Sequence, residues 1–263
     1  MPPSGSHPRR RQDKPRAKKF RPAGTYPIDT GTARIIADPE RDGAYVLEVN
    51  GVPSSRIVLG APRVLGFDYM EWIAACLREP RTVVHLGGAG CSLPRYCADV
   101  WPASRNIVVE IDGALSELTR SLFDVPAHFH TSDARTYVHS LSPGSVDAVV
   151  RDVFDGPTTP RHVTTVEFYR AVARALSPGG VYVANIGDRA GLAETRAELA
   201  GMVVAFPHVG ALSTPGMFSG NSYGNVVVWG SDRAIEPGAV NGIKRADAAW
   251  VRTMTEGIAP RRD

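Results

Sequence analysis

The chain is poor in cysteine and has no long apolar run. Its three cysteines among 263 residues, Cys76, Cys91 and Cys97, lack the paired spacing of zinc ligands. An odd, dispersed set is typical of a reducing compartment and not of a disulfide framework. No stretch approaches the roughly 18 consecutive apolar residues that a membrane span needs, and no apolar signal region follows the basic N-terminus. The sequence therefore predicts a cytoplasmic protein without membrane association and without a metal.

Acidic residues are scarce at the start of the chain. Residues 1–21 hold eight Lys or Arg side chains and one acid, Asp13, so this segment carries +7 while the whole chain carries +3. Because the segment also lacks apolar periodicity, we predict a disordered basic tail over residues 1–31. It has two interpretations, a solubilising extension or a weak, non-specific contact with nucleic-acid phosphates.

The whole chain is 43% hydrophobic, so the part beyond this tail can form a sizeable core. Residues 32–65 alternate in short runs around Asn50-Gly51, which predicts a small β-hairpin subdomain. From residue 66 to 231, strands alternate with helices of 10 to 15 residues. This pattern predicts an α/β fold with a Rossmann-like, mostly parallel seven-stranded sheet and helices on both faces. Residues 232–263 are expected to form a peripheral tail or a short helix.

The most informative stretch is rich in glycine. A β-branched apolar run ends at Gly87, Gly88 and Gly90, the pattern of a strand that ends where the backbone approaches a ligand. About twenty residues later a second apolar strand ends at Glu110 and Asp112, where a carboxylate could accept hydrogen bonds from ribose hydroxyls. Together these features predict a nucleoside pocket. The alternative is a tight strand-to-helix turn beside a solvated glutamate.

Further acids follow the next two expected strands. Because ligands gather at the carboxyl ends of parallel strands, Asp133 and Asp152 should lie at the same edge as Gly87 and Glu110. Asp152, and Asp155 three residues later, could take a proton from an amine or attract a cation, or they could form Asx turns or a helix cap. Asp133 could accept a hydrogen bond from an adenine amine or cap the helix that follows it.

Other polar side chains give weaker indications. His85 lies within an apolar strand and is interpreted as a core group instead of a base, and Cys91 as a packing residue instead of a nucleophile. Tyr69 and Glu71 are two apart on an expected helix, so at most one of them should face the pocket. Tyr223 is interpreted as a packing residue.

These motifs resemble those of the spermidine synthase family, the polyamine aminopropyltransferases, a branch of the class I S-adenosylmethionine-dependent methyltransferase-like fold. The resemblance runs from about Ala44 to Gly230. It implies that Glu110 and Asp112 form the ribose-binding strand end, and that Asp133-Ala134 holds adenine. The motifs that carry it include the Asn50-Gly51 hairpin turn, Tyr69-Met70-Glu71 in place of Tyr-His-Glu, the glycine motif from Leu86 to Arg95, and Asp152-Val153-Phe154-Asp155 as the Asp-x-x-Asp catalytic loop.

The chain also departs from the family pattern. The acid of the family's Gly-Gly-Gly-Asp-Gly-Gly motif falls at Gly90, the histidine becomes Met70, and the hairpin glutamine falls near Ser54. The Asp-Ser-Ser-Asp-Pro loop becomes Asp-Val-Phe-Asp-Gly. These departures predict that the site retains the residues that bind the nucleoside and has lost several of the residues that bind the polyamine. Gly90→Asp is expected to improve diamine binding if the loop accepts the new Cβ.

The resemblance implies a transferase that uses decarboxylated S-adenosylmethionine, or S-adenosylmethionine, as co-substrate and needs no metal. It would move an aminopropyl group to a small-molecule amine. In this interpretation Asp152 is the general base and also contacts the co-substrate, Asp155 is a second catalytic acid, and Tyr69, Glu71 and Asp155 are substrate contacts. The expected partners are that amine and, in a homodimer, a second copy of the chain. Two alternatives stay open, an S-adenosylmethionine-dependent methyltransferase and a catalytically silent nucleoside-binding protein.

Overall fold

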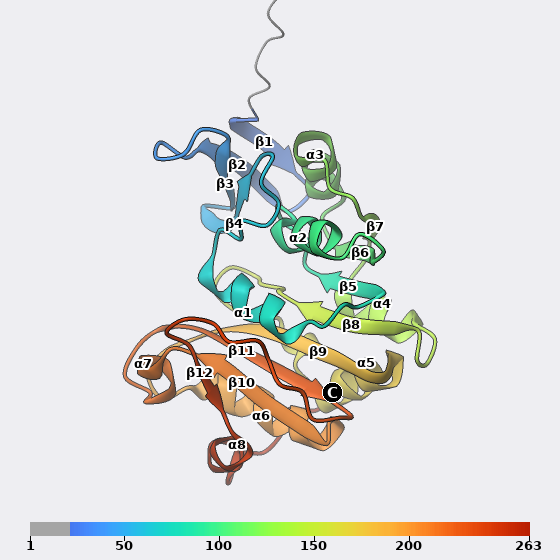
Figure 1. The fold of residues 1–263 in the computed structure, drawn as a ribbon, viewed down its shortest axis with the longest axis vertical. Coiled ribbons are helices and arrows are strands. Elements are labelled where there is room, and N and C mark those ends of the chain that lie inside the picture. Colours follow the sequence, from blue (N-terminus) through green and yellow to red (C-terminus); the bar gives the residue numbers. More distant parts are fainter. Residues whose placement is uncertain (1–21) are drawn as a thin grey trace, which may run out of the picture.

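The computed structural model describes residues 22–263, which form two sheets (Figure 1). The first is an antiparallel four-stranded sheet in chain order, made of β1 (Gly24–Ile28), β2 (Gly31–Ala37), β3 (Ala44–Val49) and β4 (Val52–Val58). Asn50 and Gly51 join β3 to β4 with φ of 51° and 79°. Two positive φ values are those of the type I′ turn, so the predicted hairpin is confirmed.

The predicted tail was too long at its C-terminal end. Residues 24–28 form β1, which pairs antiparallel with β2 and buries Ile28. Pro27 obscured this strand in the sequence, but proline is tolerated on an edge strand, and β1 is an edge strand. For residues 1–21, the predictions of disorder and of nucleic-acid contact lie outside the described residues.

The second sheet has the order β12-β10-β11-β9-β8-β5-β6-β7. Strands β5 to β9 pair in parallel, while β10, β11 and β12 run antiparallel to their neighbours. Its strands are β5 (Thr82–Leu86), β6 (Arg105–Glu110), β7 (His128–Thr131), β8 (Val146–Arg151), β9 (Leu176–Asp188), β10 (His208–Ser213), β11 (Gly224–Ser231) and β12 (Lys244–Ala246). The helices are α1 (Asp68–Cys76), α2 (Ser92–Val100), α3 (Gly113–Phe123), α4 (Ala134–Ser140), η1 (Arg161–Val163), α5 (Val166–Ala175), α6 (Ala193–Ala205), α7 (Pro215–Phe218) and α8 (Ala248–Thr255).

The mixed α/β fold is confirmed, with one addition to the sheet. Seven strands were predicted, and within residues 22–263 the sheet has an eighth, β12, which pairs with β10. It comes from the C-terminal segment expected to be a tail or short helix, and the short helix α8 follows it. At three residues, β12 is too short for a period-two pattern to predict it.

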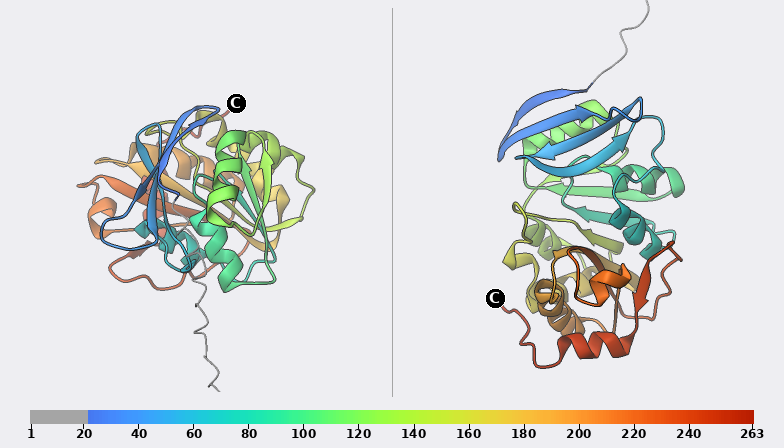
Figure 2. Two further views of the ribbon diagram at one scale, coloured as in Figure 1. Left: turned by 90° about the horizontal axis from the view of Figure 1, so that it is seen from above. Right: turned by 90° about the vertical axis from the view of Figure 1, so that its left-hand side faces the viewer.

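Helices cover both faces of this sheet. On β8, Val149 packs in the cluster that includes α4, α5 and α6, whereas Ala148 and Val150 pack in the cluster that includes α1 and α2. This alternation is the period of two that a strand imposes on its side chains. The small N-terminal sheet instead packs with α3, through residues such as Leu47, Leu115 and Phe123, and lies beyond the β5 and β6 side of the large sheet (Figures 1 and 2). Within the described part of the chain, no helix is long and apolar enough to cross a membrane.

Candidate functional site

The candidate site lies at the carboxyl ends of the parallel strands. The amide of Gly87 donates to the carbonyl of Val109 (2.9 Å), and the amide of Asp152 donates to the carbonyl of Leu86 (2.9 Å). These bonds continue the ladders of β5 with β6 and β8, so Gly87 and Asp152 lie side by side just past the strand ends. Asp133 follows β7 at the same edge. The expected gathering of these residues is therefore what the sheet produces.

Two glycines allow the loop after β5 to approach its neighbours. Gly87 has φ of +86°, and a Cβ there would lie 2.3 Å from the carbonyl oxygen of Asp152. A Cβ on Gly88 would lie 2.8 Å from Cγ1 of Val108. The amide of Gly88 instead donates to Oε2 of Glu110 at 2.8 Å, and Oε1 accepts from the amide of Asp112 at 3.1 Å. The half-buried Glu110 carboxylate thus joins the glycine loop to the end of β6.

Gly90 is packed against the N-terminal sheet. Its amide donates to Oγ of Ser55 on β4 (2.9 Å), and a Cβ would lie 2.5 Å from Cδ1 of Ile57 and 2.7 Å from Cβ of Ser55. An aspartate at position 90 therefore fits only if β4 moves. The condition attached to the Gly90→Asp prediction is not met, because a segment some 35 residues earlier fills the space.

Asp112 is occupied by structural contacts. It is 2% exposed, caps α3 by accepting from the amide of Leu115 (2.7 Å), and accepts from the amide and the hydroxyl of Thr30 (both 2.7 Å) and from the amide of Asp29 (3.2 Å). Burial would raise the pKa of Asp112, but these hydrogen bonds outweigh it and lower the pKa. Asp112 therefore serves as the N-cap of α3. The proposed ribose contact then depends on Glu110 alone.

Asp133 also caps a helix, and it has a partner that the sequence did not indicate. Oδ1 accepts from the amide of Thr136 in α4 (2.8 Å), and Oδ2 lies 2.7 Å from Nε2 of His162 in η1. Burial opposes these hydrogen bonds, but they lower the pKa of Asp133. Ala134, the other predicted adenine contact, is buried in the first turn of α4. His162 follows a Pro/Thr-rich loop, and no local pattern connects it to Asp133.

Asp152 is held from two distant elements. Its Oδ2 accepts from the hydroxyl of Tyr69 on α1 (2.9 Å), and its Oδ1 accepts from Nδ2 of Asn185 on β9 (3.0 Å). Burial raises the pKa of Asp152, although both hydrogen bonds act in the opposite direction. A half-buried carboxylate with a raised pKa and fixed orientation is suited to general-base chemistry. Asn185 was missed because it lies inside the buried strand β9, with nothing local to mark it.

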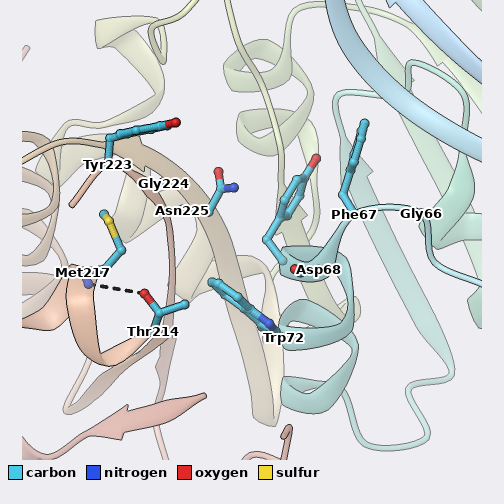
Figure 3. A pocket seen from close by; sticks show the side chains of 10 residues that line it. Gly66, Phe67, Asp68, Trp72, Thr214, Met217, Tyr223, Gly224 and Asn225 are labelled. Carbon is cyan, nitrogen blue, oxygen red and sulfur yellow. Dashed lines mark hydrogen bonds between the residues drawn. The ribbon is translucent and has the colours of Figure 1, made fainter. Parts of the chain in front are cut away.

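A cavity of about 360 Å³ opens beside Tyr69, lined on one wall by α1 and the residues before it and on the other by α7 and the start of β11 (Figure 3). Asp68 is the one acid among the described residues that line it, and the rings of Phe67 and Tyr69 stack with centroids 5.9 Å apart. The full lining is Gly66, Phe67, Asp68, Tyr69, Trp72, Thr214, Met217, Tyr223, Gly224 and Asn225.

The cavity distinguishes among the predicted substrate contacts. Tyr69 lines it, whereas Glu71 is exposed and does not, as expected for two residues on diverging faces of one helix. Tyr223 is 88% exposed and lines the cavity, so its interpretation as a packing residue is wrong. Asp155 is exposed in a turn where its main chain bridges to Thr158. The structure therefore gives Asp152 and Asp155 different environments.

The remaining candidates behave as core groups. Burial lowers the pKa of His85 to about 4, and its Nε2 lies 2.9 Å from Oδ1 of Asn106, so the ring is neutral near pH 7. Burial raises the pKa of the Cys91 thiol, which disfavours the reactive thiolate. Both observations agree with the packing interpretations. No group of three or more metal-ligating side chains occurs in the described part of the chain.

The comparisons with known proteins support first a fold class and then a family. The structure is similar to that of human methyltransferase-like protein 13 in complex with SAH, with a TM-score of 0.52, 21% identity, and coverage of 71% of this chain and 88% of that one. At this identity the likeness shows the fold alone. It defines the class as a methyltransferase-like, Rossmann-like α/β fold.

A second solved structure is far more similar. It is a probable spermidine synthase from Corynebacterium glutamicum, with a TM-score of 0.86 and 39% identity over 92% of this chain and 96% of that one. The chain therefore belongs to the spermidine synthase family. The polyamine aminopropyltransferase of Vibrio vulnificus is 34% identical over 128 residues, which cover 45% of this chain and 43% of that relative. The match thus spans less than half of that curated relative's length. No family model matches the chain.

Proposed function

We propose that this protein transfers an aminopropyl group from decarboxylated S-adenosylmethionine to a small-molecule amine. The observation that carries the proposal is Asp152, a half-buried carboxylate held by Tyr69 and Asn185 directly beside the glycine loop. Tyr69 also lines the cavity of about 360 Å³, so the candidate base lies between a loop suited to a nucleoside and a space suited to an acceptor.

The nucleoside would be held by the loop at Gly87 and Gly88, by Glu110 and by Asp133. The Glu110 carboxylate already accepts from the amides of Gly88 and Asp112. Each carboxylate oxygen has two lone pairs, so Glu110 can accept further bonds from ribose hydroxyls. Asp133 with Ala134 would hold the adenine, and His162, at 2.7 Å from Asp133, would flank it.

Asp152 would act on the attacking amine. An ammonium group has no lone pair, so Asp152 takes a proton as the amine nitrogen attacks the carbon beside the sulfonium. The new N–C bond forms as the C–S bond breaks, and methylthioadenosine leaves with the electron pair on sulfur. Alignment of the two reactants can lower the barrier by roughly 7 to 11 kcal/mol. The chain's contribution is thus orientation and one proton acceptor.

The cavity is less acidic than a multiply charged amine requires. Asp68 and Asp152 are the acids close to it, while Glu71 and Asp155 are exposed away from its lining. Trp72 and Tyr69 can offer ring faces to an ammonium group, which compensates in part for missing carboxylates. We therefore expect slow turnover of putrescine. Asp155 remains a proposed contact for the far end of a longer amine.

The test is to identify the nucleoside product. The protein is incubated with decarboxylated S-adenosylmethionine or with S-adenosylmethionine, together with putrescine or other primary amines. Release of methylthioadenosine from the decarboxylated donor is the expected result. Release of S-adenosylhomocysteine instead would establish methyl transfer, and tight donor binding without either product would establish a silent nucleoside-binding protein.

A further inference from the structure

A fully buried ion pair lies behind the candidate base. Arg151, the last residue of β8, and Glu198 on α6 are both 0% exposed, and Nη1 of Arg151 lies 2.9 Å from Oε2 of Glu198. Nη2 donates to the other oxygen of Glu198 at 3.1 Å, so the contact is bidentate. The hydroxyl of Tyr169 on α5 adds a third bond to Glu198, at 2.8 Å. The free-energy cost of removing two charges from water can equal the gain from their attraction. A contribution to stability is therefore a weak explanation for the presence of this buried pair.

The guanidinium also holds two main-chain carbonyls. Nη2 donates to the carbonyl of Asn185 at 3.2 Å, and Nη1 donates to the carbonyl of Val163 at 3.3 Å. Arg151 is directly bonded to Asp152 in the chain, and successive strand residues point to opposite faces of a sheet. The Arg151 side chain accordingly packs between the sheet and α5 and α6, while Asp152 faces Tyr69 on α1.

Both carbonyls belong to segments that position the site. Asn185 is the residue whose side chain donates to Asp152 at 3.0 Å, so fixing its peptide fixes that donor. Val163 ends the segment 152–163, and the residue before it, His162, contacts Asp133 at 2.7 Å. The Arg151 guanidinium therefore holds Val163, at the far end of the loop that begins at Asp152. It also holds the main chain of β9 at Asn185, the residue that orients the Asp152 carboxylate.

We infer that Arg151, held by Glu198, is a positioning residue that sets the geometry of Asp152 through Asn185 and of His162 through Val163. The catalytic part of this inference rests on the proposed function. A purely structural pair would be replaceable by apolar side chains without effect on the site. A positioning pair would not, because methylene groups cannot hold two carbonyls.

The experiment replaces the whole network, so that no buried charge is left alone. The triple variant Arg151→Met, Tyr169→Phe, Glu198→Leu removes both charges and the tyrosine hydroxyl at similar volume, and apolar replacements of this kind are often neutral or stabilising. We expect a folded protein whose kcat for aminopropyl transfer is lower by about 10- to 100-fold, because small misplacements of reacting groups have effects of this size.

Two readouts separate positioning from bulk stability. Arg151 lowers the pKa of Asp152 against the raising effect of burial, so its loss should move the acidic limb of the kcat/KM profile to higher pH. Amide hydrogen exchange should also become faster at Val163, whose amide donates to the carbonyl of Pro160, while α5 and α6 stay protected.

Two further variants serve as controls. Leu199→Ala removes a fully buried side chain from α6, the helix that carries Glu198. It should lower the free energy of unfolding without changing the pH profile of kcat/KM. Arg151→Lys keeps the positive charge, but its ammonium group cannot bind two carbonyls and a carboxylate at once as the planar guanidinium does. This variant should therefore have the native acidic limb of the kcat/KM profile and a kcat below the native value. Arg151→Lys also keeps the inference testable if the triple variant does not fold.

The outcomes are distinct. A folded triple variant with native kcat, pH profile and exchange at Val163 would overturn the inference, as would full activity in Arg151→Lys if the triple variant cannot be prepared. If the native protein releases no methylthioadenosine, the proposed function fails, and the exchange measurement alone then decides whether Arg151 holds the 152–163 segment.

Discussion

The two halves of the site are built differently. On the proposed nucleoside side, the glycine loop and its carboxylate partner belong to one βαβ unit, since the amide of Gly88 donates to Glu110, 22 residues away. On the proposed acceptor side, Asp152 is held by Tyr69, 83 residues earlier, and by Asn185, 33 residues later. The cavity beside it combines residues 66–72 with residues 214–225. Local motifs can therefore indicate a nucleoside site, whereas an acceptor site depends on which distant elements the sheet brings together.

The largest expected effect isolates the acceptor side. Asp152→Asn keeps the shape of the side chain and removes its basicity, so aminopropyl transfer should fall by about 100- to 10,000-fold, the usual contribution of a general base. Affinity for the decarboxylated donor should stay within a few-fold, measured by calorimetry. Glu117→Gln, an exposed change on α3, is the matched control for loss of one carboxylate. Undiminished turnover in Asp152→Asn would remove Asp152 as the base.

The next prediction compares two neighbouring acids on the nucleoside side. Glu110→Gln should weaken donor binding by about fivefold, since bonds to a charged acceptor exceed neutral ones by roughly 1 kcal/mol. Asp112→Ala should instead lower the free energy of unfolding by about 1 to 2 kcal/mol through the lost cap of α3 and leave donor affinity unchanged. Calorimetry and thermal unfolding of both variants provide the measurements. Equal affinity losses would contradict the separation of their roles.

A smaller effect concerns the Tyr69 hydroxyl, which donates to the proposed base Asp152. The Tyr69 hydroxyl donates to Asp152 and favours its charged form, so Tyr69→Phe should raise the pKa of Asp152 further. The base works deprotonated, above its pKa. The acidic limb of the kcat/KM profile should therefore move to higher pH, and activity should be lost first in weakly acidic buffer. Tyr137→Phe, at the far edge of the sheet beside His130, should leave the profile in place.

A small change in the free energy of unfolding is expected from a substitution in the glycine loop. Ala89 has φ of 35° and Cys91 has φ of 56°, in the left-handed region that is unfavourable for residues with a Cβ. Ala89→Gly should stabilise the protein by about 0.5 kcal/mol, because relief of strain exceeds the added chain entropy. Ala173→Gly within α5 should have the opposite sign. A lower thermal midpoint for Ala89→Gly would show that the loop is not strained.

The smallest effect is expected at the basic N-terminus. Deletion of residues 1–21 should leave the thermal midpoint and donor affinity nearly unchanged, since this segment has no apolar pattern. Retention on heparin or RNA, compared before and after deletion, tests the predicted nucleic-acid contact. A drop of many degrees in the midpoint would contradict the predicted tail.

Much of the fold followed from local pattern. The alternation of strands and helices predicted the parallel sheet, and Asn50-Gly51 predicted the β3–β4 hairpin. The errors occurred where the local pattern was short or interrupted, at β1 with its Pro27 and at the three-residue β12. Tyr223 was misjudged for a different reason, because nothing in its neighbours shows that it lies at the rim of a cavity.

The sequence by itself determined where each parallel strand ends and which residues follow it, because strand period, glycine spacing and cap residues are properties of short segments. It thereby brought Gly87, Glu110, Asp133 and Asp152 to one edge. Only the tertiary structure decided what each side chain contacts there. It engaged Asp112 with Thr30, closed the space at Gly90 with Ser55 and Ile57, and placed Arg151 behind Asp152. Those contacts join segments that are distant in the chain, and packing of whole elements, not local propensity, sets them.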